Sequence, residues 1–263
     1  MGKRERYEPG TFCWVDLQTT DREGAKAFYA ALFGWEAEDM PAGDAGTYTM
    51  LRLDGDEVCG LYEMEDARSE QGVPPHWLSY VSVEDADATA SKARELGGTA
   101  FGEAFDVGDA GRMAFVQDPT GAMLGAWQPR QHIGARRVND PGCLGWNELQ
   151  SREPEAAASF YAALFGWEME PQEYDGKLAY VTIKNAGWSN GGIMPMTDQH
   201  GDVPPHWLPY FIVLSCDDAV ARVRELGGDV LVEPFNVMES GRIAVVSDPQ
   251  GAVFALFEGE TDD

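Results

Sequence analysis

The chain contains one nine-residue string twice: Phe-Tyr-Ala-Ala-Leu-Phe-Gly-Trp-Glu fills residues 28–36 and again residues 160–168. Three shorter strings also repeat in the same order, 130 positions apart. A repeat this long is a whole domain rather than one unit of a solenoid, so the chain is predicted to be two copies of one domain. The shorter strings are Val-Pro-Pro-His-Trp-Leu at 73–78 and 203–208, Arg-Glu-Leu-Gly-Gly at 94–98 and 224–228, and Asp-Pro-x-Gly at 118–121 and 248–251.

The composition is that of a globular protein with an acidic surface. Its 263 residues suffice for two domains of ordinary size, and 44% of them are hydrophobic. The net charge of −26 would repel nucleic acid, whose binding needs a basic face. This charge either keeps a solvated surface soluble or draws a cationic ligand toward an acidic groove. No apolar run reaches the roughly 18 residues of a membrane span, so no membrane partner is predicted.

Cysteine use and the first residues bear on location. The four cysteines are scattered, and none forms a C-x-x-C pair, which is typical of reduced thiols. The first six residues are polar and lack the apolar region of a signal peptide. A cytoplasmic protein is predicted.

Each copy opens with a strand and a helix. Residues 12–18 alternate in the manner of a strand. The segment 20–23, Thr-Asp-Arg-Glu, has the capping-box pattern of a helix start, and Gly34 is a typical helix end. The second copy predicts the same pair of elements at residues 144–150 and 154–166.

The rest of each copy predicts short strands and a second helix. In the first copy that helix begins at Asp85 and ends at Gly97, and residues 118–121 form a turn between strands. The pattern in each copy is therefore a strand, a helix and further strands, twice over. Strands are predicted at 47–53, 57–64, 78–83, 99–105, 113–117 and 122–128 in the first copy, and at 178–184 and 191–196 in the second. Domains are placed at 8–130 and 142–260, with a linker at 131–141.

This series resembles the vicinal oxygen chelate superfamily, which includes glyoxalase I, bleomycin-resistance proteins and extradiol dioxygenases. The matching motifs are Asp21 with the Phe-Tyr…Leu-Phe-Gly-Trp string at 28–35, Leu-Gly-Gly at 96–98 and Asp-Pro-x-Gly at 118–121. The chain resembles, in particular, tandem two-domain actinobacterial members described as hydroxylase-like or glyoxalase-like. The resemblance implies an α+β fold: two tandem glyoxalase-like domains, with four βαβββ modules forming cup-shaped sheets in an intrachain pseudo-dimer. Pairing of modules within a copy and across copies both fit the sequence.

The resemblance also implies a divalent metal in the cup, held by His, Gln or Glu at four positions of each copy. Counting from the shared motifs places these positions on residues that do not coordinate such a metal. The sequence therefore predicts no metal and no cofactor at the family positions. They are Trp14, Gly60, Leu78 and Gly125 in the first copy, and Trp146, Gly192, Leu208 and Ala255 in the second.

Strand alternation predicts which side chains share the cup face. Asp16 and Gln18 follow Trp14 on that face, while His76 and Tyr80 flank Leu78. Glycine or alanine at the former ligand positions would leave volume, so we expect an aromatic-walled cavity for a flat or amphiphilic ligand. In the second copy, Glu148 stands at the position of Asp16 and His206 at that of His76. Further ligand-binding candidates are Gly60 and Trp127 in the first copy, and Trp146, Gln150, Gly192, Tyr210 and Phe257 in the second.

The leading hypothesis is metal-independent binding of a cationic or aromatic small molecule, which the protein would sequester as a toxic or signalling compound. It would act as a monomer with an internal pseudo-dimer, with further dimerisation left open. An alternative is a glyoxalase-like lyase or a hydroxylase- or dioxygenase-like enzyme. It would use His–carboxylate pairs for acid–base work, or a metal at unexpected positions. The pairs would be His76 with Asp16 and His206 with Glu148, or the same residues exchanged between copies.

A third hypothesis is a structural or interaction protein whose cups are filled by side chains. Each candidate residue has a plain structural interpretation that fits it. The tryptophans and tyrosines can fill core, and the carboxylates can accept hydrogen bonds from backbone or a tyrosine. The histidines follow two prolines and can be bonded within their own loops.

Overall fold

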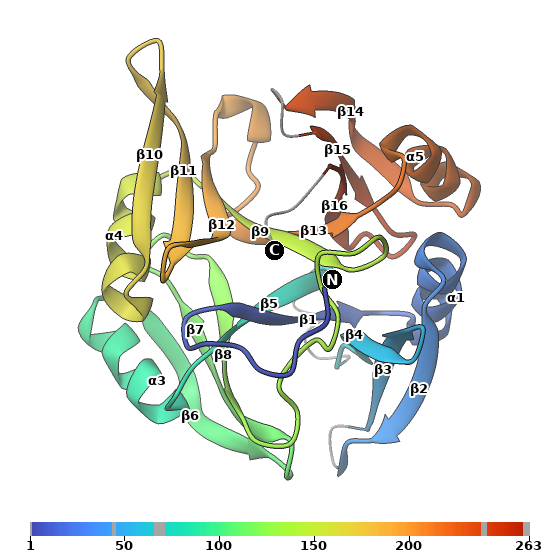
Figure 1. The fold of residues 1–263 in the computed structure, drawn as a ribbon, viewed down its shortest axis with the longest axis horizontal. Coiled ribbons are helices and arrows are strands. Elements are labelled where there is room, and N and C mark those ends of the chain that lie inside the picture. Colours follow the sequence, from blue (N-terminus) through green and yellow to red (C-terminus); the bar gives the residue numbers. More distant parts are fainter. Residues whose placement is uncertain (1, 44–45, 66–71, 238–240, 260–263) are drawn as a thin grey trace.

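The computed structural model describes residues 2–43, 46–65, 72–237 and 241–259. Within these described residues, each copy forms one eight-stranded sheet with two helices on one face, and the second copy lies against the first (Figure 1). The first copy comprises β1 (Phe12–Thr19), α1 (Arg22–Phe33), β2 (Glu36–Pro41), β3 (Thr47–Leu53), β4 (Asp56–Glu63), β5 (His76–Ser82), α3 (Ala86–Glu95), β6 (Thr99–Val107), β7 (Gly111–Gln117) and β8 (Met123–Pro129). The second comprises β9 (Leu144–Ser151), α4 (Pro154–Phe165), β10 (Glu168–Tyr174), β11 (Lys177–Asn185), β12 (Trp188–Pro195), the 3₁₀ turn η2 (Asp198–His200), β13 (His206–Ile212), α5 (Cys216–Glu225), β14 (Asp229–Val237), β15 (Gly241–Ser247) and β16 (Val253–Glu258).

The modules pair within each copy, which settles the choice that the sequence left open. The first sheet has the order β2-β3-β4-β1-β5-β8-β7-β6, and the second has the equivalent order from β10 to β14. The first strands of two modules, β1 and β5, pair antiparallel at the centre of the sheet. The predicted α+β fold with four βαβββ modules is confirmed. None of the described helices is long and apolar enough to span a membrane.

Local chemistry explains two differences from the sequence prediction. The outer strands β2 and β10 were not predicted because most of their residues are exposed and polar, so they lack the alternation of a half-buried strand. The N-cap of α1 is Asp21 rather than Thr20: its side chain accepts a hydrogen bond from the amide of Gly24. The helix ends at Gly34, which adopts a left-handed conformation.

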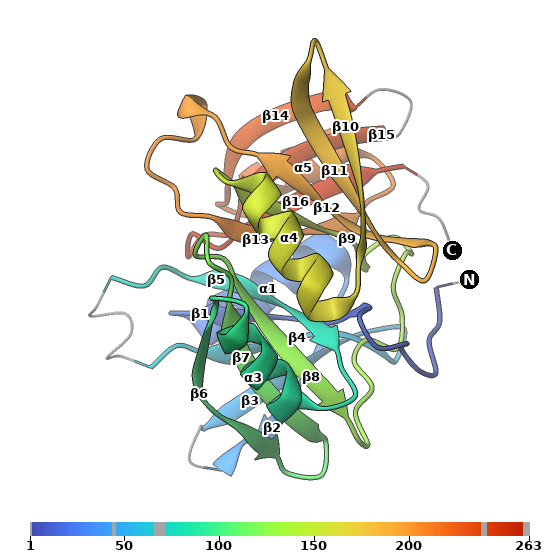
Figure 2. The same ribbon diagram turned by 90° about the vertical axis from the view of Figure 1, so that its left-hand side faces the viewer.

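The two main hydrophobic cores are each built from both copies, while three smaller clusters have their buried residues in one copy or the linker. The first core joins α1 and the backs of β1, β3 and β4 to α5 and the backs of β13, β15 and β16. The second core joins α4 and the backs of β9, β11 and β12 to α3 and the backs of β5, β7 and β8. Figures 1 and 2 show the resulting helix pairs, α1 beside α5 and α3 beside α4. Neither copy therefore has a complete core of its own.

The repeated strings supply the contacts across this interface. The hydroxyl of Tyr29 on α1 donates to Asp248 of the second copy at 3.0 Å. The indole of Trp35 donates to the carbonyl of Gly142 at 2.7 Å, and the equivalent Trp167 donates to Gly10 at 2.6 Å. The Phe-Tyr…Trp and Asp-Pro-x-Gly strings thus hold the two copies together on the face opposite the cups.

Candidate functional site

The register of the first sheet brings the positions implied for metal ligands together on the cup face, the face away from the helices. Asp16 on β1 pairs with Gly60 on β4 and with Leu78 on β5. Tyr80 then pairs with Gly125 on β8. The second sheet repeats this register: Glu148 pairs with Gly192 and Leu208, and Tyr210 pairs with Trp146 and Ala255.

Tyrosines fill the space beside the two glycines of the first cup. A Cβ atom at Gly60 would overlap the hydroxyl of Tyr48 on β3, and one at Gly125 would overlap the ring of Tyr80. The expectation that these small residues leave open volume is therefore wrong in the first copy. Glycine is needed at these positions because a tyrosine ring occupies the place into which a metal-coordinating side chain would project.

A tryptophan, two tyrosines and a carboxylate form one hydrogen-bonded group in the first cup. The Nε1 of Trp14 donates to the Tyr48 oxygen at 3.0 Å. The hydroxyls of Tyr48 and Tyr80 both donate to Oδ2 of Asp16, at 3.5 and 3.0 Å. Asp16 therefore accepts hydrogen bonds from tyrosines, which was the structural alternative to a catalytic role.

Asp16 is deeply buried, with 4% of its surface exposed. Burial raises the pKa of its carboxyl group to about 7, against the opposing effect of the hydrogen bonds from Tyr80 and Tyr48. Its Oδ1 atom is also buried and has no hydrogen-bond partner among the described residues. Asp16 is thus a carboxyl group that exchanges its proton near neutral pH and has one oxygen free.

The second cup repeats the arrangement with a longer carboxylate. Tyr180 on β11 fills the space at Gly192, where a Cβ atom would overlap its hydroxyl. The Nε1 of Trp146 donates to the Tyr180 oxygen at 3.0 Å. Gly192, like Gly60, thus accommodates a tyrosine, and the expectation of open volume is wrong at this position of the second copy as well.

Glu148 takes the place of Asp16 in this second group. Its Oε1 accepts a hydrogen bond from the Tyr210 hydroxyl at 2.8 Å and one from Nε2 of Gln150 at 2.5 Å. Burial raises the pKa of Glu148, against hydrogen bonds from Tyr210, Tyr180 and Gln150. Gln150 therefore belongs to the carboxylate group of the second cup.

The residues at the family positions do not fit a divalent metal. Such a metal needs imidazole, carboxylate or thiolate donors converging on one point. The cup offers an indole, glycine and a leucine side chain at these positions, and Tyr48 and Tyr80 occupy the space between them. Among the described residues, no group of three His, Cys, Asp or Glu side chains is arranged to hold a metal ion.

The close fit of Tyr48 against Gly60 gives a first testable prediction. We expect Gly60→Ala to lower the free energy of unfolding by about 1–3 kcal/mol, because the added methyl group overpacks the cup. Adding Tyr48→Val to the same protein should recover part of this loss. The measurement is urea unfolding followed by circular dichroism, and an unchanged midpoint for Gly60→Ala would contradict the fit.

The predicted histidines lie at the starts of β5 and β13 and are bonded within their loops. Nδ1 of His76 is 2.8 Å from the carbonyl oxygen of Pro74, and Nδ1 of His206 is 2.9 Å from that of Pro204. Each histidine lies in the same sheet as the carboxylate of its own copy. His76 pairs with Gln18, two residues from Asp16 along β1, and His206 pairs with Gln150, two residues from Glu148 along β9. This arrangement favours the within-copy pairs over the exchanged ones.

The remaining predicted residues also lie in the cups. Gln18 is buried and pairs with His76 across β1 and β5. Trp127 is buried in the first cup, and Phe257 is half-buried in the second. The predicted residues of each copy thus lie on one sheet, with the histidines at the strand starts and the carboxyl group near the centre.

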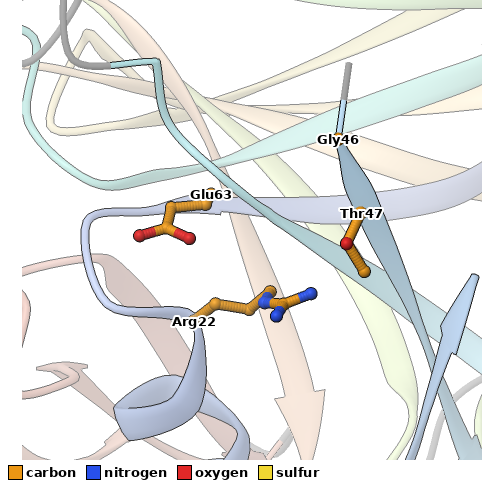
Figure 3. Close-up of a pocket in the computed structure, with 4 residues that line it drawn as sticks. All are labelled: Arg22, Gly46, Thr47 and Glu63. Atoms are coloured by element: carbon orange, nitrogen blue, oxygen red, sulfur yellow. The ribbon is translucent and has the colours of Figure 1, made fainter. Parts of the chain in front are cut away.

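Two hollows lie outside the cups. One, of about 230 Å³, is lined by Arg22, Gly46, Thr47 and Glu63 (Figure 3). The other, of about 360 Å³, follows the interface between α1 and α5. Neither includes a residue that the sequence predicted for the site.

Sequence reasoning missed three residues of the site. Tyr48 and Tyr180 stand at equivalent positions of the two copies, and this repetition was the available signal. His132 lies in the linker, and its ring is 4.6 Å from that of Trp14. No motif marks His132, because the linker has no counterpart inside the repeat.

Comparisons with known proteins agree with this architecture. A model of the Glyoxalase/Bleomycin resistance protein/Dioxygenase superfamily matches residues 11–125, and a glyoxalase-like domain model matches residues 147–257. The chain is 44% identical to "Putative glyoxylase CFP32" of Mycobacterium tuberculosis, over 98% of both chains. It is 34% identical to "Anthracycline biosynthesis protein DnrV" of Streptomyces peucetius, over 96% of this chain and 94% of the relative.

Solved structures share the fold at low identity. The Mn(II)-bound glyoxalase from Novosphingobium aromaticivorans has a TM-score of 0.67 at 15% identity. The match covers 100% of this chain and 85% of the glyoxalase chain. The 2,3-dioxygenase LapB from Pseudomonas sp. KL28 has a TM-score of 0.65 at 14% identity, over 99% of this chain and 94% of its own.

Fold and site together define a tandem βαβββ protein with two cups, each centred on a carboxyl group bound by tyrosines. The chain belongs to the Glyoxalase/Bleomycin resistance protein/Dioxygenase superfamily, which is also called the vicinal oxygen chelate superfamily.

Proposed function

We propose that this protein binds a small organic molecule in its cups without a metal. One observation carries the proposal: in both copies, a tryptophan–tyrosine–carboxyl group occupies the positions where the superfamily resemblance implies a metal chelate. Such a group offers aromatic surface and a few fixed polar atoms, which suits an organic ligand. The protein would sequester its ligand. Its four free, buried cysteines suit a reducing compartment, and we place it in the cytoplasm.

The ligand that we propose is flat, aromatic and cationic. Indole and phenol rings in the cups favour stacking, and a ring face attracts a cation. The net charge of −26 raises the local concentration of cations around the protein. Two relatives, DnrV and DauV, are named as anthracycline biosynthesis proteins, and anthracyclines are planar polycyclic compounds.

The experiment compares the anthracycline daunorubicin, which carries an amine, with its neutral aglycone daunomycinone. We expect saturable quenching of tryptophan fluorescence by both in EDTA-dialysed protein, with tighter binding of daunorubicin at low salt and a smaller difference at high salt. Trp146→Ala should weaken binding at least tenfold. Trp188→Ala should not, because Trp188 is 67% exposed at the start of β12.

Two results would count against the proposal. Binding that appears only after Zn²⁺ or Mn²⁺ is returned to the dialysed protein would contradict metal independence. No saturable quenching by either compound would contradict a flat aromatic ligand.

A second candidate function is an enzyme, and the carboxyl group of Asp16 favours it. A carboxyl group with a pKa of about 7 and one unbonded oxygen is suited to exchange a proton with a substrate near neutral pH. The reaction would be of the lyase or hydroxylase type, in line with the relatives named as glyoxylases. Turnover that Asp16→Asn abolishes in metal-free protein would favour the enzyme over the binding protein.

A further inference from the structure

We infer that only the second cup takes the ligand and that the linker closes the first cup from inside the molecule. This inference rests on the proposed binding function and assigns it to one of two equivalent sites. The two cups share their central hydrogen-bonded group but differ in what covers it and in the size of the side chains around it.

The linker covers the first cup at Trp14. The ring of His132 lies edge-on to the ring of Trp14, with centroids 4.6 Å apart, and edge-on to the ring of Trp127 at 5.7 Å. The Nε1 of Trp127 donates to the carbonyl oxygen of His132 at 2.9 Å. Only 5% of Trp14 and 7% of Trp127 remain exposed.

The N-terminal arm fixes the linker in this position. The hydroxyl of Tyr7 donates to the carbonyl oxygen of Ala135 at 2.7 Å, and the amide of Ala135 donates to the carbonyl oxygen of Cys13 on β1 at 2.8 Å. Ala135 and Val138 are buried in the same cluster as Trp14. The cover is therefore part of the packed structure of the first copy.

The second cup lacks an equivalent ring. Trp146 and Phe257, the counterparts of Trp14 and Trp127, are only half-buried. Among the residues that the structure describes, neither ring has an edge-on partner from the linker or a loop like His132; their neighbours, Tyr210 and Tyr180, belong to the cup itself. These partly exposed rings give the second cup more accessible aromatic surface than the buried Trp14 and Trp127 give the first.

Side-chain size differs in the same direction. On β7 and β8 of the first cup and on β15 and β16 of the second, the second copy has the smaller apolar residue at three equivalent positions and an isoleucine of similar volume in place of a methionine at a fourth; Ala255 in place of Gly125 is the exception, by one methyl group. Long methionine side chains fill irregular gaps, whereas branched aliphatic side chains extend less far from the sheet. The pairs are Met113 and Ile243, Phe115 and Val245, Met123 and Val253, and Trp127 and Phe257.

The second cup also indicates the shape of its ligand. Trp146 and the half-buried aliphatic side chains of Ile243, Val245 and Val253 form an apolar surface. Nδ1 of His206 donates to the Pro204 carbonyl, which leaves Nε2 as an acceptor. His206 pairs with Gln150, four residues along β9 from Trp146, or ~13 Å at ~3.3 Å per residue. This geometry fits a planar polycyclic ligand with a hydroxyl or amine donor at one end.

Labelling of introduced thiols tests the inference without a ligand. The native cysteines are buried, so Trp14→Cys and Trp146→Cys each add one reporter at equivalent positions. We expect N-(1-pyrenyl)maleimide to label Trp146→Cys at least tenfold faster than Trp14→Cys. Adding His132→Gly to Trp14→Cys should raise its rate several-fold. Equal rates, or faster labelling of Trp14→Cys, would overturn the inference.

A matched exchange of side chains tests it with daunorubicin as the probe. Val245→Phe gives the second cup the residue of the first and should weaken binding at least tenfold, while Phe115→Val should leave the affinity unchanged. Urea midpoints confirm that both proteins fold. Binding that survives Val245→Phe but is lost in Trp14→Ala would overturn the inference and leave the proposed function standing. If the unmodified protein does not bind daunorubicin, the proposed function fails, and the labelling rates still decide which cup is open.

Discussion

The Tyr29→Ala protein is expected to lose about 3–5 kcal/mol of its free energy of unfolding. Tyr29 is fully buried in the core that both copies share. Its hydroxyl donates to Asp248 at 3.0 Å and accepts from Nε1 of Trp77 at 3.3 Å. Truncation therefore leaves a cavity and two unpaired buried polar groups.

Urea unfolding followed by tryptophan fluorescence and by circular dichroism measures this loss. Tyr174→Ala is the control, because Tyr174 is 76% exposed on β10, and its midpoint should hardly change. Because each core contains residues of both copies, the two signals should report one transition in all three proteins. Separate transitions for the two copies would contradict the shared cores.

The Asp16→Asn protein is expected to be more stable than the unmodified protein at pH 8, by up to about 4 kcal/mol. The pKa of Asp16 is raised from 3.8 to about 7 in the folded protein, so the folded state holds the proton to a higher pH than the unfolded state does. Its contribution is complete below about pH 4, falls as the pH rises to about 7 and is constant above that. Asparagine cannot ionise and avoids the cost of a buried charge.

The measurement is the free energy of unfolding at several pH values between 4 and 8. The gain from Asp16→Asn should shrink toward pH 4. Asp175→Asn, on the exposed turn between β10 and β11, should leave the profile unchanged. A loss of stability at pH 8 would mean that the ionised carboxylate of Asp16 is itself stabilising, which contradicts a pKa raised by burial.

Much of the fold could be predicted because the repeated strings carry strong local signals. Gly34 and Gly166 end helices, and Asp118 with Gly121 forms a turn, so element order follows from short patterns. The same patterns could not reveal that Tyr29 and Trp35 bind the other copy, because spacing along a chain does not report which surface a side chain meets.

The cup face was predicted from alternation, but what fills it was not. Asp16, Tyr80 and Trp14 share a face as expected. Tyr48 comes from a neighbouring strand, and only strand order brings its hydroxyl to Gly60. The cover by His132 depends on the path of a linker that has no periodic pattern, so it lay beyond any prediction from the sequence.

The interface between the two copies lies on the opposite side of each sheet from the cups. A substitution inside a cup therefore does not change the contacts between the copies. One copy can therefore lose ligand binding and still supply half of each shared core to the other copy. Such a division of labour is open to a fused pair but closed to a dimer of identical chains, in which every change appears in both halves.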